Sequence, residues 1–156
     1  MSDIEIRPIT PADAGEVLTL QRAAFVQEAQ IYGSTDMPPL TQTLEELEAE
    51  LVENLGRVAV DGHRIVGALR ARLDGELLLI GRIAIAPDQQ GRGIGTQLLG
   101  AAEQAGKDAG AREAELFTGS LSEANLRLYE REGYTESERI TQDGGTEQVF
   151  LRKPLA

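Results

Sequence analysis

Three glycines at alternate positions, Gly91, Gly93 and Gly95, form the segment of this 156-residue chain best suited to chemistry. They follow a continuous apolar stretch that is typical of a buried strand and ends at Pro87. After them, apolar residues recur at helical spacing. A helix N-terminus offers unpaired N–H groups and the positive end of the helix dipole, so bare backbone there suits a phosphate. We interpret the segment as an anion-binding turn.

Two common phosphate-binding loops fit this turn poorly. A P-loop needs a lysine directly after its last glycine, and no lysine follows these glycines. A dinucleotide fingerprint, G-x-G-x-x-G, could begin at Gly91, but Thr96 stands where the third glycine belongs. The strands before the turn are also predicted to be linked as hairpins rather than to run parallel. The P-loop is therefore excluded, and the dinucleotide loop is disfavoured.

A third interpretation fits the turn together with the helix that comes after the next predicted strand. The segment Gln90 to Gly95 (QGRGIG) matches the pattern Q-x-x-G-x-G, and Asn125 and Tyr129 follow with N-x-x-x-Y spacing. In this combination the sequence resembles the GCN5-related N-acetyltransferase (GNAT) family. The resemblance covers most of the chain. It is strong from about Glu76 to Tyr134 and weak over residues 22–55.

The resemblance implies acetyl-CoA as the acyl donor and no metal. In this family the backbone amides of the glycine turn hold the pyrophosphate, and the preceding strand pairs with the pantetheine arm like an added strand. The strand expected at residues 113–117 would splay away and leave a slot for the thioester. The residues expected to contact the cofactor are Ile83, Ala84, Ile85, Gln90, Gly91, Arg92, Gly93, Ile94, Gly95, Thr96 and Asn125.

Tyr129 is the catalytic residue that the resemblance implies. Attack of an amine on a thioester releases a thiolate with a pKa like that of cysteine, about 8.5, and a tyrosine with a pKa near 10 can donate a proton to it. Asn125 and Tyr129 are four residues apart and so share one helix face. The alternative is structural, with Tyr129 packed as a half-buried aromatic residue and Asn125 capping the start of the helix or solvated there.

The sequence leaves the proton acceptor open. A lysine-like amine with a pKa of about 10.4 is only roughly 0.04% neutral at pH 7, so the reaction needs a base. Some family members carry Glu or His on the strand before the glycine turn, but Leu79 and Gly81 occupy those positions here. The candidates are Tyr32, Asp36 and Glu28, all from the N-terminal part of the chain, or an ordered water.

The elements that must position these residues follow an α/β order. Seven strands are predicted, at residues 4–6, 57–60, 65–73, 77–86, 113–117, 134–140 and 146–152. Four helices are predicted: one starting at Thr10, one running from the Thr43–Glu46 capping box to Gly56, one at 94–109 and one at 122–131. A loop is expected at residues 31–40. The order β-α-α-β-β-β-α-β-α-β-β matches the GNAT fold, a mixed, mostly antiparallel sheet with flanking helices.

Length and composition limit the other possibilities. A chain of this size is expected to form one domain, here an acetyltransferase domain over residues 1–156. A net charge of −11 argues against nucleic acid or an anionic membrane as partner. No apolar segment is long enough to span a bilayer, and no secretory signal is visible. The chain has no cysteine for a zinc–thiolate site, and we expect a cytoplasmic protein.

The expected function is transfer of an acetyl group from acetyl-CoA to a primary amine, on a small molecule, peptide or protein, by direct attack in a ternary complex. Residues 11–56 contain nine acidic residues and a single basic one, Arg22. These acids could attract an amine; the alternative is that they form a solvated helix face. A non-catalytic module that binds or senses acyl-CoA and an enzyme for a longer acyl group also remain. The terminal strands could pair with a second copy, so a homodimer is a further expectation.

Overall fold

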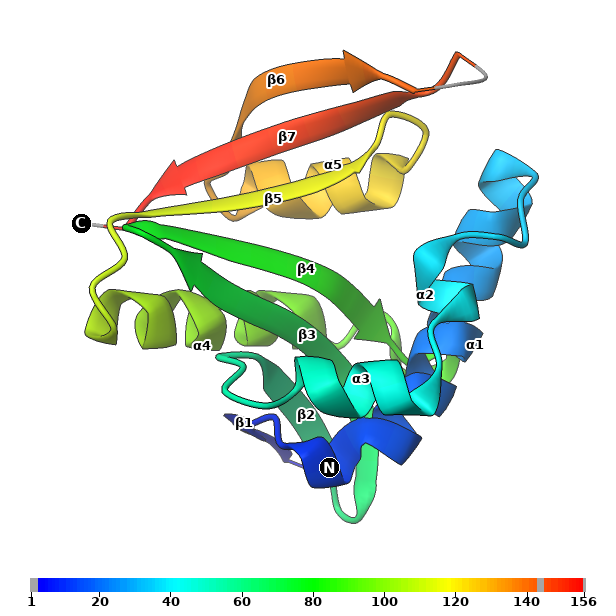
Figure 1. Ribbon diagram of the computed structural model, residues 1–156, viewed down its shortest axis with the longest axis vertical. Helices are drawn as coiled ribbons and strands as arrows, with labels where there is room; N and C mark the ends of the chain where they lie inside the picture. The colour runs from blue at the N-terminus through cyan, green and yellow to red at the C-terminus, as the bar shows by residue number, and fades with distance from the viewer. Residues whose placement is uncertain (1–2, 143–144, 156) are drawn as a thin grey trace.

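A seven-stranded sheet runs through the computed structural model, which describes residues 3–142 and 145–155. Its strand order is β1-β2-β3-β4-β5-β7-β6 (Figure 1). Only β4 and β5 pair in parallel; the other neighbours are antiparallel. The predicted mixed, mostly antiparallel sheet is therefore confirmed. The strands are β1 (Ile4–Pro8), β2 (Arg57–Asp61), β3 (Arg64–Asp74), β4 (Leu77–Ile85), β5 (Glu113–Gly119), β6 (Thr135–Thr141) and β7 (Glu147–Pro154).

The described residues contain five α helices, one more than the four predicted. The additional helix, α2 (Pro38–Thr41), lies partly in the segment expected to be a loop. Pro38 stands at its first position, where the fixed φ of proline suits a helix and its missing N–H costs no hydrogen bond. The other four are α1 (Ala14–Tyr32), α3 (Leu44–Glu50), α4 (Ile94–Asp108) and α5 (Glu123–Arg131). None of the five is long and apolar enough to cross a membrane.

Helix α3 begins as predicted but ends early. Thr43 and Glu46 form the expected capping box, with the Glu46 N–H donating to Thr43 Oγ1 over 3.2 Å. The helix was predicted to reach Gly56, yet it ends at Glu50. The Asn54 side chain provides the physical reason, because its Oδ1 accepts from the N–H groups of Gly56 (2.8 Å) and Ala71 (3.0 Å). These bonds tie the chain to β3 and compete with continued helix.

The pairing of β4 with β5 ends soon after it begins. It covers only Leu77–Leu79 against Glu113–Glu115, and β5 then continues along β7 as far as Gly119. On its other side, β4 contains a bulge: Gly81 pairs with Arg70 and Ala84 with Ala68, so two residues oppose one. The two central strands therefore diverge within the sheet, where the resemblance implied a slot.

Helix α4 covers one face of the sheet, and α1 and α3 cover the other (Figure 1). Gly67 of β3 allows α4 to approach closely, since a Cβ at this position would lie 2.7 Å from Ile94 Cγ2. Ile94, Leu98 and Leu99 on that side of α4 are buried in the core. The start of α4, where the glycine turn ends, is thus seated directly on β3.

Candidate functional site

A cavity of about 380 Å³ lies where β4 and β5 part. Its walls come from segments far apart in the chain: the C-terminal half of α1, the α1–α2 connection, β4, β5, α5 and the chain at both ends of the β6–β7 connection. The polar side chains that matter for chemistry are Glu28 and Tyr32 from α1, Ser122 just before α5, and Asn125 and Tyr129 on α5. The predicted residues of α5 therefore meet two of the predicted proton acceptors in one cavity.

Tyr129 is buried, with 5% of its surface exposed, and its side chain lines this cavity. Its hydroxyl has no hydrogen-bond partner among the described residues. The ring packs edge-on against Tyr134, with centroids 6.3 Å apart. Burial, and then the negative charge of Glu28, raise the pKa of Tyr129. The cavity therefore holds a protonated phenol that is available to donate to a ligand.

Asn125 lies one helical turn before Tyr129 and lines the same cavity. Its Nδ2 donates to Thr118 Oγ1 of β5 over 3.3 Å. This is a long bond to a neutral partner. The Asn125 amide thus reaches toward β5 on the cavity wall, and it can form a further hydrogen bond with a ligand. Asn125 is not the cap of α5, because Ser122 occupies the N-cap position.

A chain of three hydrogen-bonded side chains lies on the cavity wall. Leu121 N–H donates to the Tyr32 hydroxyl (3.1 Å), Tyr32 and Ser122 are 2.7 Å apart, and Ser122 Oγ donates to Glu28 Oε2 (2.6 Å). Because Ser122 uses its proton on Glu28, the Tyr32 hydroxyl must donate to Ser122. Glu28 thus ends an oriented chain as the acceptor. Asp36, the third candidate base, is not among the lining residues.

The backbone conformation of the glycine turn favours glycine at two positions. Gly91 and Gly93 have φ values of 83° and 73°, in the left-handed region that favours glycine, and Gly93 is the N-cap of α4. A Cβ at Gly95 would lie 3.2 Å from Leu128 Cδ2, so the turn packs against α5. The unpaired N–H groups at the start of α4 therefore lie beside the helix that carries Asn125 and Tyr129.

The other predicted cofactor residues divide by position. Ile83 lines the cavity, whereas the side chains of Ala84 and Ile94 are buried in the core and leave only backbone to a ligand. Arg92, exposed on the turn, donates to Asp61 Oδ2 over 3.1 Å and to Gln89. Thr96 Oγ1 donates to Glu132 Oε2 over 3.1 Å. The residues of the turn lie outside the lining of the cavity, and they are Gln90, Gly91, Arg92, Gly93, Ile94, Gly95 and Thr96.

A second cavity, of about 680 Å³, lies beside the first. It is lined by the end of α3, by β3, β4 and β5, and by Phe150. The two cavities have five lining residues in common: Ile80–Arg82, Leu116 and Phe117. Leu79 and Gly81, the two positions without a base, lie on this side. The two cavities therefore meet where β4 and β5 diverge.

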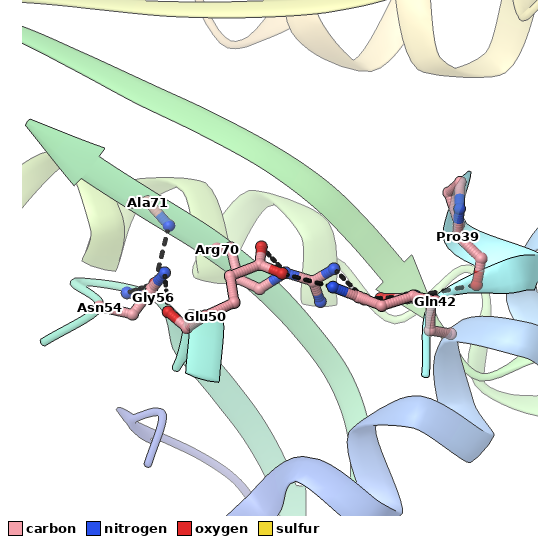
Figure 2. Close-up of polar contacts among 8 residues, drawn as sticks. Pro39, Gln42, Glu50, Asn54, Gly56, Arg70 and Ala71 are labelled. Atoms are coloured by element: carbon pink, nitrogen blue, oxygen red, sulfur yellow. Dashed lines mark hydrogen bonds and ion pairs between the residues drawn. The ribbon is translucent and has the colours of Figure 1, made fainter. Parts of the chain in front are cut away.

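A partly buried polar network connects α1, α3 and the sheet, and Figure 2 shows Arg70 between Glu50 and Gln42. Arg70 Nε donates to Glu50 Oε1 (2.7 Å), and Gln42 Nε2 donates to Glu50 Oε2 (2.7 Å). Gln21 Nε2 donates to the Pro39 carbonyl (2.8 Å). Burial lowers the pKa of Arg70 and the charge of Glu50 opposes that shift. The network holds α2, which lines the first cavity, against β3.

Ser122 and the second cavity escaped sequence reasoning. Ser122 is separated from Glu28 by 94 residues, so no local spacing connects them. A small polar residue at the start of a predicted helix was the available signal, and it indicates only a cap. The second cavity depends on the strand order, which brings together residues near positions 53, 72 and 150.

Comparison with known proteins agrees with the geometry. A profile of the acetyltransferase (GNAT) family matches residues 17–134. Over 88 residues the chain is 35% identical to N-alpha-acetyltransferase 30 of Schizosaccharomyces pombe, covering 53% of this chain and 59% of that protein. It spans between 29% and 59% of the length of the curated relatives it matches.

Two solved structures share the fold. The PaiA N-acetyltransferase of Thermoplasma acidophilum in complex with coenzyme A has a TM-score of 0.82 at 19% identity, covering 97% of this chain and 99% of that chain. YncA of Salmonella typhimurium, described as a putative acetyltransferase with its cofactor acetyl-CoA, has a TM-score of 0.78 at 18% identity, covering 99% and 95%. Profile and fold confirm the resemblance that the sequence motifs carry, and the chain belongs to the acetyltransferase (GNAT) family.

Proposed function

We propose that this protein transfers an acetyl group from acetyl-CoA to a primary amine by direct attack in a ternary complex. One observation carries the proposal: the unpartnered, protonated hydroxyl of Tyr129 and the carboxylate of Glu28 share the cavity at which β4 and β5 diverge. A proton donor and a proton acceptor on one slot are what the reaction requires. Family membership and the fold support the reaction type.

Acetyl-CoA fits the residues that are present. The left-handed glycines and the free N–H groups at the start of α4 suit the pyrophosphate, and a side chain at Gly91 or Gly93 would be strained there. The unpaired edge of β4 at Ile83–Ile85 would bind the pantetheine arm, and Asn125 would donate to it. When bound, the cofactor supplies the thioester carbonyl that the amine attacks. No metal is required for this reaction.

Each residue then has a defined task. Glu28 takes the proton of the bound ammonium, with Ser122 holding its Oε2 and leaving Oε1 for the amine. The nitrogen attacks the thioester carbon, the N–C bond forms, and the C–S bond breaks. Tyr129 donates its hydroxyl proton to the sulfur. The nitrogen of the new amide then loses its extra proton, which returns to the Tyr129 oxygen. Protonation of Glu28 removes one of the two causes that raise the pKa of Tyr129, so proton uptake makes Tyr129 a better donor.

Tyr129→Phe tests this function, because phenylalanine keeps the ring packed on Tyr134 and removes only the hydroxyl. We expect kcat to fall about 10²- to 10³-fold, with the Kd of acetyl-CoA nearly unchanged. Since the pKa of Tyr129 is raised, its phenol stays protonated at alkaline pH. The rate of the wild-type protein should therefore not fall at alkaline pH through ionisation of this residue. Rates come from thiol release over a panel of amines, and affinity from calorimetry.

Tyr134→Phe is the matched control. Tyr134 is also buried, but its hydroxyl donates to Glu103 over 2.8 Å and does not line the cavity, so its loss should affect stability and not turnover. Equal turnover of Tyr129→Phe and wild type would remove Tyr129 from the mechanism. Tight acetyl-CoA binding with no thiol release from any amine would favour a non-catalytic acyl-CoA-binding module instead.

A further inference from the structure

Two arginines on the second cavity, Arg72 of β3 and Arg82 of β4, have no ion pair or hydrogen bond within residues 3–142 and 145–155. Every other arginine in this part of the chain makes at least one. The chain has 26 acids against 15 lysines and arginines, so potential partners are plentiful. Two unused guanidinium groups on one cavity therefore point to a ligand that carries negative charge.

The backbone at Arg82 is in an unfavourable conformation. Its φ is 54°, in the left-handed region that side chains rarely adopt, and it lies in the bulge of β4. Only one other non-glycine residue in the described ranges has a positive φ, and this is Glu53, which lines the same cavity. Such strain concentrates at functional sites. The bulge places Arg82 on the walls of both cavities.

The acids of the second cavity are mostly engaged. Glu50 accepts from Arg70, and Glu115 accepts from Arg152 over 2.8 Å. Glu53 makes no bond among the described residues and is exposed. Among the described residues, the lining charges without a partner are therefore two positive and one negative. This excess of unpaired positive charge favours an anion, although the whole chain is strongly acidic.

An apolar wall completes the cavity. The ring of Phe117, 46% exposed, packs on the ring of Phe150 with centroids 5.3 Å apart. Phe117 also lines the first cavity, so this wall leads from the arginines to the slot. A carboxylate on an aliphatic or peptide stem matches this combination of guanidinium and aromatic surface.

We propose that the acceptor is an amine that also carries a carboxylate. Its amine lies in the first cavity beside Glu28, its stem follows Phe117 and Phe150, and its carboxylate binds Arg72 and Arg82. This assignment rests on the proposed function and names its substrate class. A free acidic amino acid and a peptide with an acidic residue after its amino terminus offer the same chemistry, and the experiment separates them.

The kinetic test compares matched acceptors. Glutamate is paired with glutamine amide, which keeps the amine and the stem but has no carboxylate. A C-terminally amidated peptide beginning Ala-Glu is paired with one beginning Ala-Gln, each with acetyl-CoA in excess. We expect kcat/KM to be at least tenfold higher for the acid than for the amide in one of the two pairs. The pair that shows this difference identifies the acceptor as a free amino acid or as a peptide. Arg72→Gln and Arg82→Gln should each raise KM for that acid about 10- to 100-fold, since each removes a charge-assisted hydrogen bond, and leave its neutral partner unchanged.

Lys107→Gln is the control, because Lys107 is also without a partner in the described chain but lies on neither cavity. It makes the same change in net charge and should leave every KM unchanged. Equal efficiency for acid and amide in both pairs would overturn the inference while acetyl transfer stands. So would equal effects of the arginine substitutions on acid and amide.

A binding measurement keeps this assignment separate from the reaction. Glutarate, which has the carboxylates without the amine, is titrated into the CoA-loaded protein and followed by NMR shifts of the arginine side chains. Saturable binding that Arg72→Gln and Arg82→Gln abolish, and Lys107→Gln does not, supports the carboxylate site even if no amine is acetylated. Absence of glutarate binding to the wild type would overturn it.

Discussion

At the scale of single residues, the site depends on how two titratable groups affect one another. Glu28 and Tyr129 come from α1 and α5 and share the first cavity, where the negative charge of Glu28 adds to burial in raising the pKa of Tyr129. Burial of a phenol favours its neutral form, so Tyr129 stays a donor across the physiological range. Ser122, 2% exposed, orients the carboxylate.

Glu28→Gln should lower kcat/KM at pH 7 by about 10²-fold or more, because the glutamine amide cannot take the ammonium proton. The deficit should shrink as pH rises toward the pKa of the amine, since solvent then supplies the neutral acceptor. A pH–rate profile from pH 6 to 10 measures this. Asp36→Asn removes the same charge outside the cavity and should leave the profile unchanged. A pH-independent deficit in Glu28→Gln would assign Glu28 to binding rather than to proton transfer.

At the scale of elements, the position of the glycine turn depends on the packing of α4. The first residue of α4, Ile94, packs into the space that Gly67 of β3 leaves open. The same helix approaches α5 through Gly95 and Leu128. Small residues at two contacts therefore determine the position of the glycine turn relative to the cavity. Residues of α1 and α2 form another wall of the cavity, and the network of Figure 2 connects this wall to α3 and β3.

Gly67→Ala should destabilise the protein by about 1–3 kcal/mol, because its Cβ would lie 2.7 Å from Ile94 Cγ2 and 3.1 Å from Leu98 Cδ1. It should also weaken acetyl-CoA binding, since the start of α4 must move away from β3. Gly100→Ala, on the exposed side of α4 with nothing near its Cβ, should be neutral or stabilise by up to about 1 kcal/mol. Chemical denaturation and calorimetry measure both. Unchanged stability and affinity in Gly67→Ala would contradict this account of α4.

At the scale of the whole molecule, the two edges of the sheet are β1 and β6. All seven residues of β6 are exposed, and Glu136, Glu138 and Arg139 are charged. Charged residues on an edge oppose unspecific strand pairing, but Ile140 is exposed to 40% and offers an apolar contact. Association of two copies through this edge stays a prediction.

Sedimentation velocity at micromolar concentration should show a dimer of the 16.8 kDa chain, and Ile140→Lys should shift it to monomer because a charge would then stand on the paired edge. Val26→Lys is the control, since Val26 is exposed to 50% on α1, away from β6. A single monomeric species of the wild-type protein would end the dimer hypothesis.

The sequence by itself determined the features that depend on neighbouring residues. Glycines at 91 and 93 predicted the turn because left-handed φ values favour glycine, and the Thr43–Glu46 box predicted a helix start because a cap needs only four residues. The spacing of Asn125 and Tyr129 placed both on one face of a helix. The order of these elements was enough to predict the seven-stranded sheet.

The tertiary structure decided what depends on contacts between distant segments. It ended α3 at Glu50, since the partner of Asn54 is Ala71 on another strand. It placed Glu28 on the first cavity and Asp36 outside its lining, and it brought Ser122, 94 residues away in the chain, within hydrogen-bond distance of Glu28. It also left Arg72 and Arg82, on one cavity, without partners among the residues that the structure describes. Local spacing encodes the glycine turn and the shared helix face of Asn125 and Tyr129, whereas strand order and the divergence of β4 from β5 create the two cavities.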